Sequence, residues 1–257
     1  DEFRIVIELL KTSSENSRLI VMLETNGGYI ETVERLVVVM RRHYSEVFFI
    51  IPNYAYSAGT VLALSGDRIY MDYYSVLGPI DPQFPGDDGS GAVPGAGYLA
   101  KFEELTEVIN KAKDPGKVRA ELSYLIKRFD PAKLFHIEQS IEHGQSLIME
   151  WLPKYKLKDW VTTQSTGKPV TDSMRKKRAK EIAGKLGDAK KWHSHGRGIS
   201  MQRLRSEDIK LQIEDFGAEA ETSQAIRNYH GLCVDHAGRN GLNAFIHASN
   251  GLRSIST

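Results

Sequence analysis

The alternation of apolar runs with helical patterns constrains the fold of this chain more than any other feature of its sequence. Residues 19–23 and 47–51 are uninterrupted apolar runs, and each ends in a turn that contains glycine or proline. Short runs of this kind are typical of parallel strands that are buried on both faces. Between them, residues 33–40 carry apolar side chains at helical spacing. Two further short strands are predicted at residues 68–71 and 75–77, so the order of elements favours an α/β core with a parallel sheet.

Helical patterns replace the strands in the middle of the chain. Asp130 and Pro131 suit the N-cap and the first position of one long helix, Thr171 suits the N-cap of another that ends near Gly187, and Ser200 suits the N-cap of one more turn. The remaining expectations are helices over residues 98–109, 118–129 and 134–151, a glycine- and proline-rich surface loop over 85–97, and a mixed segment, helical at best, from 217 onward.

Charge and cysteine content exclude several classes of protein. Lys and Arg number 34 and Asp and Glu 33, so the net charge is +1 and no general attraction to nucleic acid is expected. The basic run at residues 175–180 is interpreted as a solvated helix face, and binding of nucleic acid through it is the minority alternative. Cys233 is the only cysteine, which rules out an internal disulfide and favours a reducing, cytoplasmic location.

The beginning of the chain gives a further expectation. The chain opens without an initiator methionine or a signal-peptide pattern, and it holds no apolar run of the roughly 20 residues that a membrane span needs. We therefore expect a fragment or a trimmed chain, which would attach to a membrane only through a segment missing from this sequence.

Ser57 stands at the point where a buried strand passes through a turn into a predicted helix. A serine there lies in the favourable field of the helix N-terminus, and the N–H of Ala58 can donate to an oxyanion. Gly27 and Gly28 follow the preceding parallel strand, so both turns should emerge at the carboxyl edge of the sheet. A glycine N–H there supplies a second donor. Ser57 as a simple N-cap is the structural alternative.

Three motifs in this order resemble the ClpP/crotonase fold superfamily. They are ETNGG at residues 24–28, AYSAGT at 55–60 and VLGPIDPQ at 76–83. Within the superfamily the chain most resembles SppA-like peptidases of the serine dehydrogenase proteinase (SDH) family, from about residue 19 to 83 and through the helices to 217. The resemblance implies a peptidase with Ser57 as nucleophile, an oxyanion hole formed by the N–H groups of Gly28 and Ala58, and assembly into closed homo-oligomers.

The resemblance leaves the general base open. ClpP-type enzymes use a histidine downstream of the nucleophile, but no histidine lies between His43 and His136. SppA-type enzymes use a lysine, and Lys101 is the best placed, beside an apolar helix face. His195, in the polar cluster at residues 192–197, is the rival base. An ordinary solvated lysine and a loop-stabilising histidine are the structural alternatives.

Two more residues accompany the site as supporting candidates. Asp81 either orients the base or holds the turn at residues 78–83, and His193 accompanies His195. A metal held by these two histidines lacks an obvious third ligand, so neither a metal nor a cofactor is expected.

The sequence thus predicts a ClpP/crotonase-like peptidase domain over residues 1–216, with a helical insertion at about 98–160 and a helical C-terminal extension at 217–257. The expected reaction is hydrolysis of peptide or unfolded protein by acyl transfer through Ser57, with Gly27 supporting the oxyanion hole. The alternatives are an acyl-CoA hydratase or thioesterase on the same fold, and a catalytically inactive scaffold.

Overall fold

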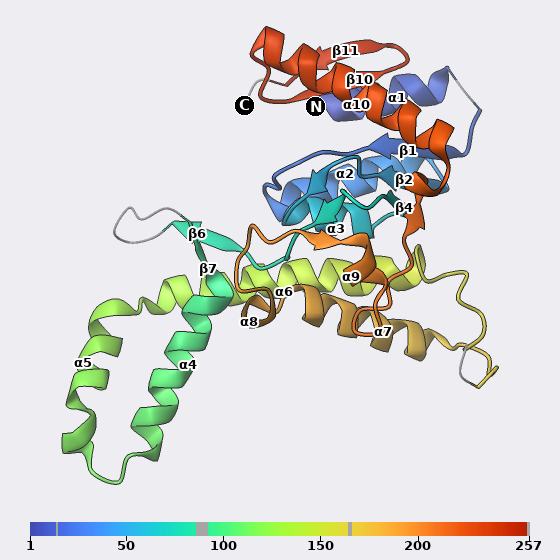
Figure 1. The fold of residues 1–257 in the computed structure, drawn as a ribbon. Helices are drawn as coiled ribbons and strands as arrows, with labels where there is room; N and C mark the ends of the chain where they lie inside the picture. The colour runs from blue at the N-terminus through green and yellow to red at the C-terminus, as the bar shows by residue number, and fades with distance from the viewer. Residues whose placement is uncertain (14, 86–91, 164–165, 256–257) are drawn as a thin grey trace.

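A four-stranded parallel sheet forms the centre of the computed structural model, which describes residues 1–13, 15–85, 92–163 and 166–255 (Figure 1). The strand order is β1-β2-β4-β9, and every neighbouring pair is parallel. The predictions at residues 19–23, 47–51 and 68–71 are confirmed to within one residue. The strands are β1 (Arg18–Met22), β2 (Glu46–Ile50), β4 (Arg68–Met71) and β9 (Glu214–Asp215).

A second, three-stranded sheet continues from the carboxyl end of the first. Its order is β3-β5-β8, where β3 (Tyr54–Ala55) and β5 (Val76–Leu77) are parallel and β8 (Ile199–Ser200) is antiparallel to β5. This small sheet brings together three segments that lie far apart in the sequence, because β5 pairs with β3 on one side and β8 on the other.

Helices pack around the sheets through narrow apolar faces. In α2 (Ile30–His43) the side chains of Val33, Val37 and Met40 are buried, which is the spacing of one helix face. In α3 (Ala58–Leu64) every residue is buried. Such a short helix must be held by its surroundings, since isolated helices of this length are unstable. The other helices of this part of the molecule are α1 (Glu2–Thr12), α6 (Pro131–Lys154), α7 (Asp172–Leu186), α8 (Ala189–Trp192) and α9 (Met201–Arg205).

The predicted caps of three helices are confirmed. The side chain of Asp130 accepts from Ala132 N–H at the start of α6, and Thr171 accepts from Met174 N–H at the start of α7. Ser200 does the same for α9 by accepting from Arg203 N–H.

Helices α4 (Gly95–Lys111) and α5 (Arg119–Arg128), with the short 3-10 turn η1 (Pro115–Val118) between them, project as an arm from the body of the molecule (Figure 1). Strands β6 (Gln83–Pro85) and β7 (Ala92–Pro94) form an antiparallel hairpin at its base. The prediction of a loop over residues 85–97 is therefore wrong at both ends, and its centre, residues 86–91, lies outside the described residues. The Phe84 ring contacts His136 edge to face and packs against Gly95, so apolar packing orders this segment.

Beyond β9 and the turn η2 (Phe216–Ala218), the chain forms α10 (Ala220–Asn240) and the antiparallel hairpin β10 (Phe245–Ala248) and β11 (Gly251–Ser254). This segment lies beside α1 (Figure 1). Arg253 of β11 pairs with Glu2 of α1 at 2.8 Å. The sequence predicted the helical character of this region but not the hairpin. No helix among the described residues is long and apolar enough to cross a membrane.

Candidate active site

The predicted site residues lie at one end of the three-stranded sheet. Because β3 and β5 are parallel, the turns that follow them, at residues 56–57 and 78–81, leave at the same end. Strand β8 runs the other way, so the loop that precedes it, at residues 193–198, lies at that end too. Thr25 forms a bridge with Ala55, which adds the loop at residues 24–28 beside β3. The fold thus brings all four polar loops to one edge.

Ser57 adopts a backbone conformation that is unusual for a residue with a side chain, with φ 54° and ψ −122°. It occupies the N-cap position of α3, yet its side chain makes no capping hydrogen bond. Strained backbone at a strand-to-helix turn is typical of nucleophilic serines, which such a turn presents at the top of a sheet. Within the described part of the chain the hydroxyl is uncommitted, which argues against Ser57 as a simple cap.

Gly27 lies directly beside this turn, and Gly28 follows it in the chain. A methyl group added to Gly27, whose φ is +106°, would stand 2.8 Å from Ser57 Cβ and 2.9 Å from the carbonyl oxygen of Tyr56. Gly28 is open to its surroundings, with nothing within 4 Å of an added methyl group. Among the described residues, no acceptor is bonded to the N–H groups of Gly28 and Ala58. Both donors predicted for an oxyanion are therefore available.

Asp81 and His195 form a hydrogen-bonded pair. His195 Nδ1 lies 3.0 Å from Asp81 Oδ1, and the side chains are 20% and 2% exposed, respectively. Gln83 Nε2 donates to the other carboxylate oxygen at 3.1 Å. A buried carboxylate on Nδ1 fixes the orientation of the ring and directs Nε2 outward. His195 lies 114 positions after Asp81 in the chain. The pairing gives its ring the orientation expected of a general base.

Ser57 and His195 are not hydrogen-bonded to each other in this single chain; the hydrogen bond of His195 among the described residues is to Asp81. Strands β3 and β8 are separated by β5 alone, which corresponds to roughly 10 Å at ordinary strand spacing. Catalytic hydrogen bonds are often long before substrate binds. The fold brings the two residues to the same edge without joining them.

Lys101 lies elsewhere, on the projecting helix α4. Its ammonium group pairs with Glu104 at 3.0 Å on the same helix, and the side chain is 54% exposed. An exposed, paired lysine lacks the desolvation that would make it a base near neutral pH. His193 ends α8 in the left-handed conformation with φ 62°, and its side chain is exposed.

Two threonines with no role predicted from the sequence organise the site. Thr25 Oγ1 accepts from Gly27 N–H at 3.0 Å, and its methyl group fills the space at Gly59. Thr60, which is fully buried, bonds the backbone of Ala55 and Gly78. Both lie inside the motifs ETNGG and AYSAGT, which was the signal available in the sequence. Nothing in the sequence shows which hydroxyl groups form hydrogen bonds with the backbone.

The C-terminal helix also reaches this edge. His230 Nε2 of α10 lies 2.7 Å from Glu24 Oε2, at the start of the glycine loop. Arg227, one turn earlier, pairs with Asp72, which is 1% exposed. Helix α10 therefore crosses from the loop after β4 to the loop after β1, along the carboxyl edge of the main sheet.

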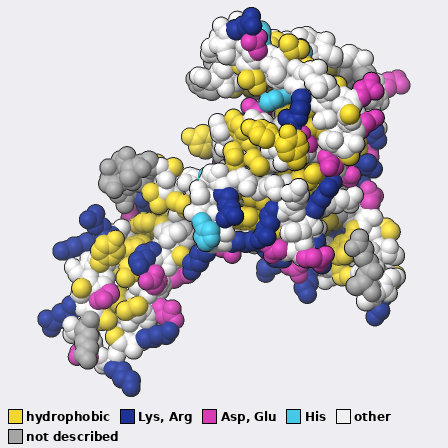
Figure 2. Space-filling view, viewed as in Figure 1, with side chains coloured by type: hydrophobic (Ala, Val, Ile, Leu, Met, Phe, Trp, Pro, Cys, Tyr) yellow, Lys and Arg dark blue, Asp and Glu magenta, His cyan; other side chains and the backbone are white. Residues whose placement is uncertain are grey.

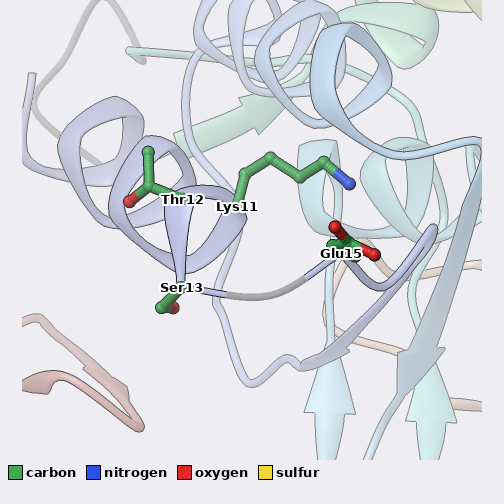
Figure 3. Close-up of a pocket in the computed structure, with 4 residues that line it drawn as sticks. All are labelled: Lys11, Thr12, Ser13 and Glu15. Atoms are coloured by element: carbon green, nitrogen blue, oxygen red, sulfur yellow. The ribbon is translucent and has the colours of Figure 1, made fainter.

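One hollow on the described surface lies away from these loops. It has a volume of about 310 Å³ at the C-terminal end of α1 and is lined by Lys11, Thr12, Ser13 and Glu15 (Figure 3). It includes none of the predicted site residues. In the described part of the chain, no group of three or more His, Cys, Asp or Glu side chains is arranged to hold a metal ion.

Comparison with known families finds a similarity over the first part of the chain. The family model for ClpP-like SDH-type serine proteinases matches residues 2–102. Over residues 2–102 the chain is thus similar to a ClpP-like domain of the SDH type. The match confirms the family and fold predicted from the motifs, and it indicates peptidase activity in general terms. Ser57, both glycines, Asp81 and Lys101 lie inside the matched range, whereas His195 lies outside it.

Two curated proteins of Methanocaldococcus jannaschii are similar to part of this chain. The uncharacterized protein MJ0137 is 27% identical over 118 residues, which cover 46% of this chain and 38% of that protein. The uncharacterized protein MJ1495 is 29% identical over 105 residues, which cover 41% and 34%, respectively. The chain thus spans little more than a third of the length of these relatives.

One solved structure is also similar, that of a mutant of 1510-N, a membrane-bound stomatin-specific protease, in complex with a substrate peptide. The similarity covers 56% of this chain and 65% of that chain, with 19% sequence identity and a TM-score of 0.32. A TM-score this low supports no statement about the site.

Proposed function

We propose that this ClpP-like chain is a serine endopeptidase that hydrolyses peptide bonds by acyl transfer through Ser57. The observation that carries the proposal is the turn at Ser57: a serine with φ 54°, at the start of a helix, whose hydroxyl caps nothing. Backbone strain of this kind costs roughly 1–3 kcal/mol and persists only where the surroundings impose it. A function that needs the hydroxyl exposed accounts for that cost, whereas a capping role does not.

The oxyanion hole in this proposal consists of the N–H groups of Gly28 and Ala58. Neither donates within the described structure; Ala58 follows the nucleophile at the start of α3, and Gly28 belongs to the loop at residues 24–28. Donors that are already oriented stabilise a developing oxyanion without reorganisation, and one such donor is worth roughly 3–4 kcal/mol. Gly27 keeps the first loop close enough for this arrangement.

The proposed base is His195, with Asp81 as its orienting partner. Asp81 is almost fully buried and bonds Nδ1 of the ring, so Nε2 is the nitrogen left for chemistry. Lys101 is the weaker candidate because it is exposed and paired with Glu104. His193 takes no direct part in this proposal.

The proposed proton transfers run between Ser57 and His195. As Ser57 Oγ forms its bond to the peptide carbonyl carbon, its proton passes to His195 Nε2, and the carbonyl electron pair moves onto the oxygen. Collapse of the tetrahedral intermediate breaks the C–N bond, and the imidazolium returns the proton to the leaving amine. Water then hydrolyses the acyl-enzyme by the same route. His195 and Ser57 must close into hydrogen-bond reach for the first transfer.

The substrate we propose is a peptide or an unfolded protein, and the working form a cytoplasmic homo-oligomer. The projecting arm supports assembly, because Leu122, Tyr124 and Ile126 of α5 and Val108 of α4 are exposed apolar side chains. Hydrophobic and charged side chains mix on this arm (Figure 2). Neutral balance of charge offers no support for a nucleic-acid partner.

The test is covalent labelling with a fluorophosphonate probe, read as intact mass, together with hydrolysis of a casein-derived peptide library. Wild type is compared with Ser57→Ala, His195→Ala and Lys101→Ala. We expect labelling to vanish in Ser57→Ala, to fall by at least a hundredfold in His195→Ala and to persist in Lys101→Ala. Loss of labelling in Lys101→Ala with retention in His195→Ala would reverse the assignment of the base.

Other outcomes distinguish the remaining candidates. An unlabelled wild type that hydrolyses or hydrates acyl-CoA, with Ser57→Ala equally active, would establish the thioester reaction instead. An unlabelled wild type without either activity would favour the scaffold.

A further inference from the structure

Thr60 lies at the junction between the turn of Ser57 and the loop of Asp81. It is in the first turn of α3, and none of its surface is exposed. Its hydroxyl lies 2.7 Å from the carbonyl oxygen of Ala55 and 2.9 Å from that of Gly78, and it accepts from Gly78 N–H at 2.9 Å. Since a hydroxyl has one proton, it donates to one of the two carbonyls at a time.

On one side Thr60 holds the nucleophile turn. Its backbone N–H donates to the carbonyl oxygen of Ser57 at 2.9 Å. Its hydroxyl reaches Ala55, the last residue of β3 and two positions before Ser57. The strained residue is therefore bracketed by two bonds from a single threonine.

On the other side Thr60 holds Gly78, three positions before Asp81. Gly78 approaches the nucleophile turn so closely that a methyl group on it would stand 3.2 Å from Ser57 N and 3.0 Å from Tyr56 Cα. Gly78 N–H also donates to Ala55 O at 3.1 Å, so β3, α3 and the loop after β5 meet around one hydroxyl.

These contacts connect the loop of Ser57 to the loop of Asp81 through Thr60, which takes no part in the proposed catalytic steps. Ser57 and Asp81 lie on different loops, and the distance between their backbones depends on how those loops are joined. A buried hydroxyl that satisfies several backbone groups rigidifies its surroundings, whereas removing it leaves those groups unpaired.

We propose that Thr60 is a positioning residue, whose hydroxyl sets the separation between Ser57 and the Asp81–His195 pair. The proposal rests on the proposed peptidase function and deepens it, because it names the group that holds nucleophile and base in register. The methyl group of Thr60 fills space, but the hydroxyl makes the connection.

The test compares Thr60→Val, which keeps the shape and loses the hydroxyl, with Thr60→Ser, which keeps the hydroxyl and loses the methyl group. Both are measured as the rate of fluorophosphonate labelling against pH and as the separate kcat and KM for a peptide that wild type cleaves. We expect Thr60→Val to lower the labelling rate and kcat at least tenfold with KM within twofold, and Thr60→Ser to stay within threefold of wild type.

Ser65→Ala is the matched control for loss of a buried hydroxyl. Ser65 is 1% exposed at the other end of α3 and donates to Leu62 O at 2.7 Å, away from the site. We expect this variant to lose thermal stability comparable to Thr60→Val while labelling at the wild-type rate. Equal losses of labelling in both variants would mean that general destabilisation, not positioning, explains the effect.

The outcomes distinguish failure of the proposed role of Thr60 from failure of the proposed peptidase function. An unlabelled wild type refutes the peptidase function itself. A labelled wild type with an equally reactive Thr60→Val, or with Thr60→Ser as impaired as Thr60→Val, overturns the role of the hydroxyl. If Thr60→Val does not fold, Thr60→Cys replaces it in the comparison with Thr60→Ser, and equal rates in those two variants overturn the proposal.

Discussion

Gly27 leaves the space that the side chain of Ser57 occupies. Its φ of +106° suits glycine alone, and a methyl group there would collide with Ser57 Cβ at 2.8 Å. The backbone of Gly27 and the side chain of Ser57 therefore cannot be varied independently. Residue-scale complementarity of this kind links the oxyanion loop to the nucleophile.

Gly27→Ala is expected to destabilise the fold by about 2 kcal/mol, since both the clash and the backbone strain must be absorbed. It should lower fluorophosphonate labelling at least tenfold, because Ser57 Cβ is the atom nearest to the added methyl group and would have to move. Urea denaturation and labelling rates measure the two effects. Gly144→Ala, in α6 where nothing lies within 4 Å, is the control and should be neutral or stabilising by up to about 1 kcal/mol. Wild-type labelling in Gly27→Ala would contradict the arrangement.

Asp81→Asn tests the pairing with His195 at the same scale. An amide keeps the size of the carboxylate but neither holds the required ring orientation nor stabilises an imidazolium, so we expect kcat to fall by roughly 10² or more. The measurement is steady-state peptide hydrolysis at several pH values. Gln83→Ala removes the other bond to Asp81 and should stay within about threefold of wild type. An Asp81→Asn variant with unchanged kcat would mean that His195 is not the base.

At this scale the sequence predicts residue types better than their geometry. The motif AYSAGT identified Ser57, because a serine between a strand and a helix is visible as a pattern. Neither the φ of 54° nor the hydroxyl of Thr60 is visible in that way, since both depend on the loop after β5. The pairing of Asp81 with His195 joins residues 114 positions apart, which local spacing does not report.

Helix α10 shows how much an element depends on a few charged contacts. It has no buried residue along its 21 positions, so apolar burial alone holds it weakly. Arg227 pairs with the buried carboxylate of Asp72, and its guanidinium lies 5.6 Å from the ring of Tyr73. His230 adds the contact with Glu24. These contacts place α10 across the carboxyl edge of the sheet.

Arg227→Met is therefore expected to loosen α10, because it leaves the Asp72 carboxylate buried without its cationic partner. We expect a loss of about 2–4 kcal/mol and faster amide hydrogen exchange across residues 220–240. Arg239→Met is the matched control on the same helix: Arg239 pairs with Asp235 and is 77% exposed, so its loss should cost less than about 1 kcal/mol. Equal exchange in the two variants would show that Arg227 does not hold the helix.

Elements with strong local patterns were predictable, and elements made by tertiary pairing were not. The parallel strands and long helices carry their own periodicity, and their caps were read correctly at Asp130, Thr171 and Ser200. The two-residue strands β3 and β8 exist only because β5 lies between them. The hairpin of β6 and β7 likewise depends on Phe84 packing against Gly95.

Across the whole molecule, a buried charge network joins the sheet to the helices beneath it. Asp67, with a side chain 4% exposed, bonds Arg41 at 2.7 Å, Lys158 at 2.5 Å and Val47 N–H at 2.8 Å. Burial alone would raise the pKa of the Asp67 carboxyl, but the hydrogen bonds from Lys158, Val47 and Arg41 outweigh it and the pKa is lowered. The stability that this carboxylate contributes is therefore present at neutral pH and lost as the pH falls through its lowered pKa.

Lys156, beside this network, has the opposite effect on stability. Burial lowers the pKa of its ammonium group from 10.5 to about 8, assisted by Arg68 and opposed by Glu214 and Asp67. Between pH 8 and 10.5 the unfolded chain then binds more protons than the folded chain, so this group makes stability rise with pH over that window. Below pH 8 the folded protein bears the full cost of the buried charge.

Lys156→Met should remove both effects, because a methionine fills similar space without a charge. We expect the free energy of unfolding at pH 7 to increase by about 1 kcal/mol, less than the full shift implies since the residue keeps some exposed surface. The rise of the free energy of unfolding between pH 8 and 10 should be smaller than in wild type. Urea denaturation at pH 7, 8, 9 and 10 measures both changes. Lys158→Met, two residues away, should instead destabilise at pH 7, because Asp67 loses a partner. Substitution of these two lysines of one loop would thus change the free energy of unfolding in opposite directions. Loss of stability in both variants would show that the Lys156 ammonium is favourably placed.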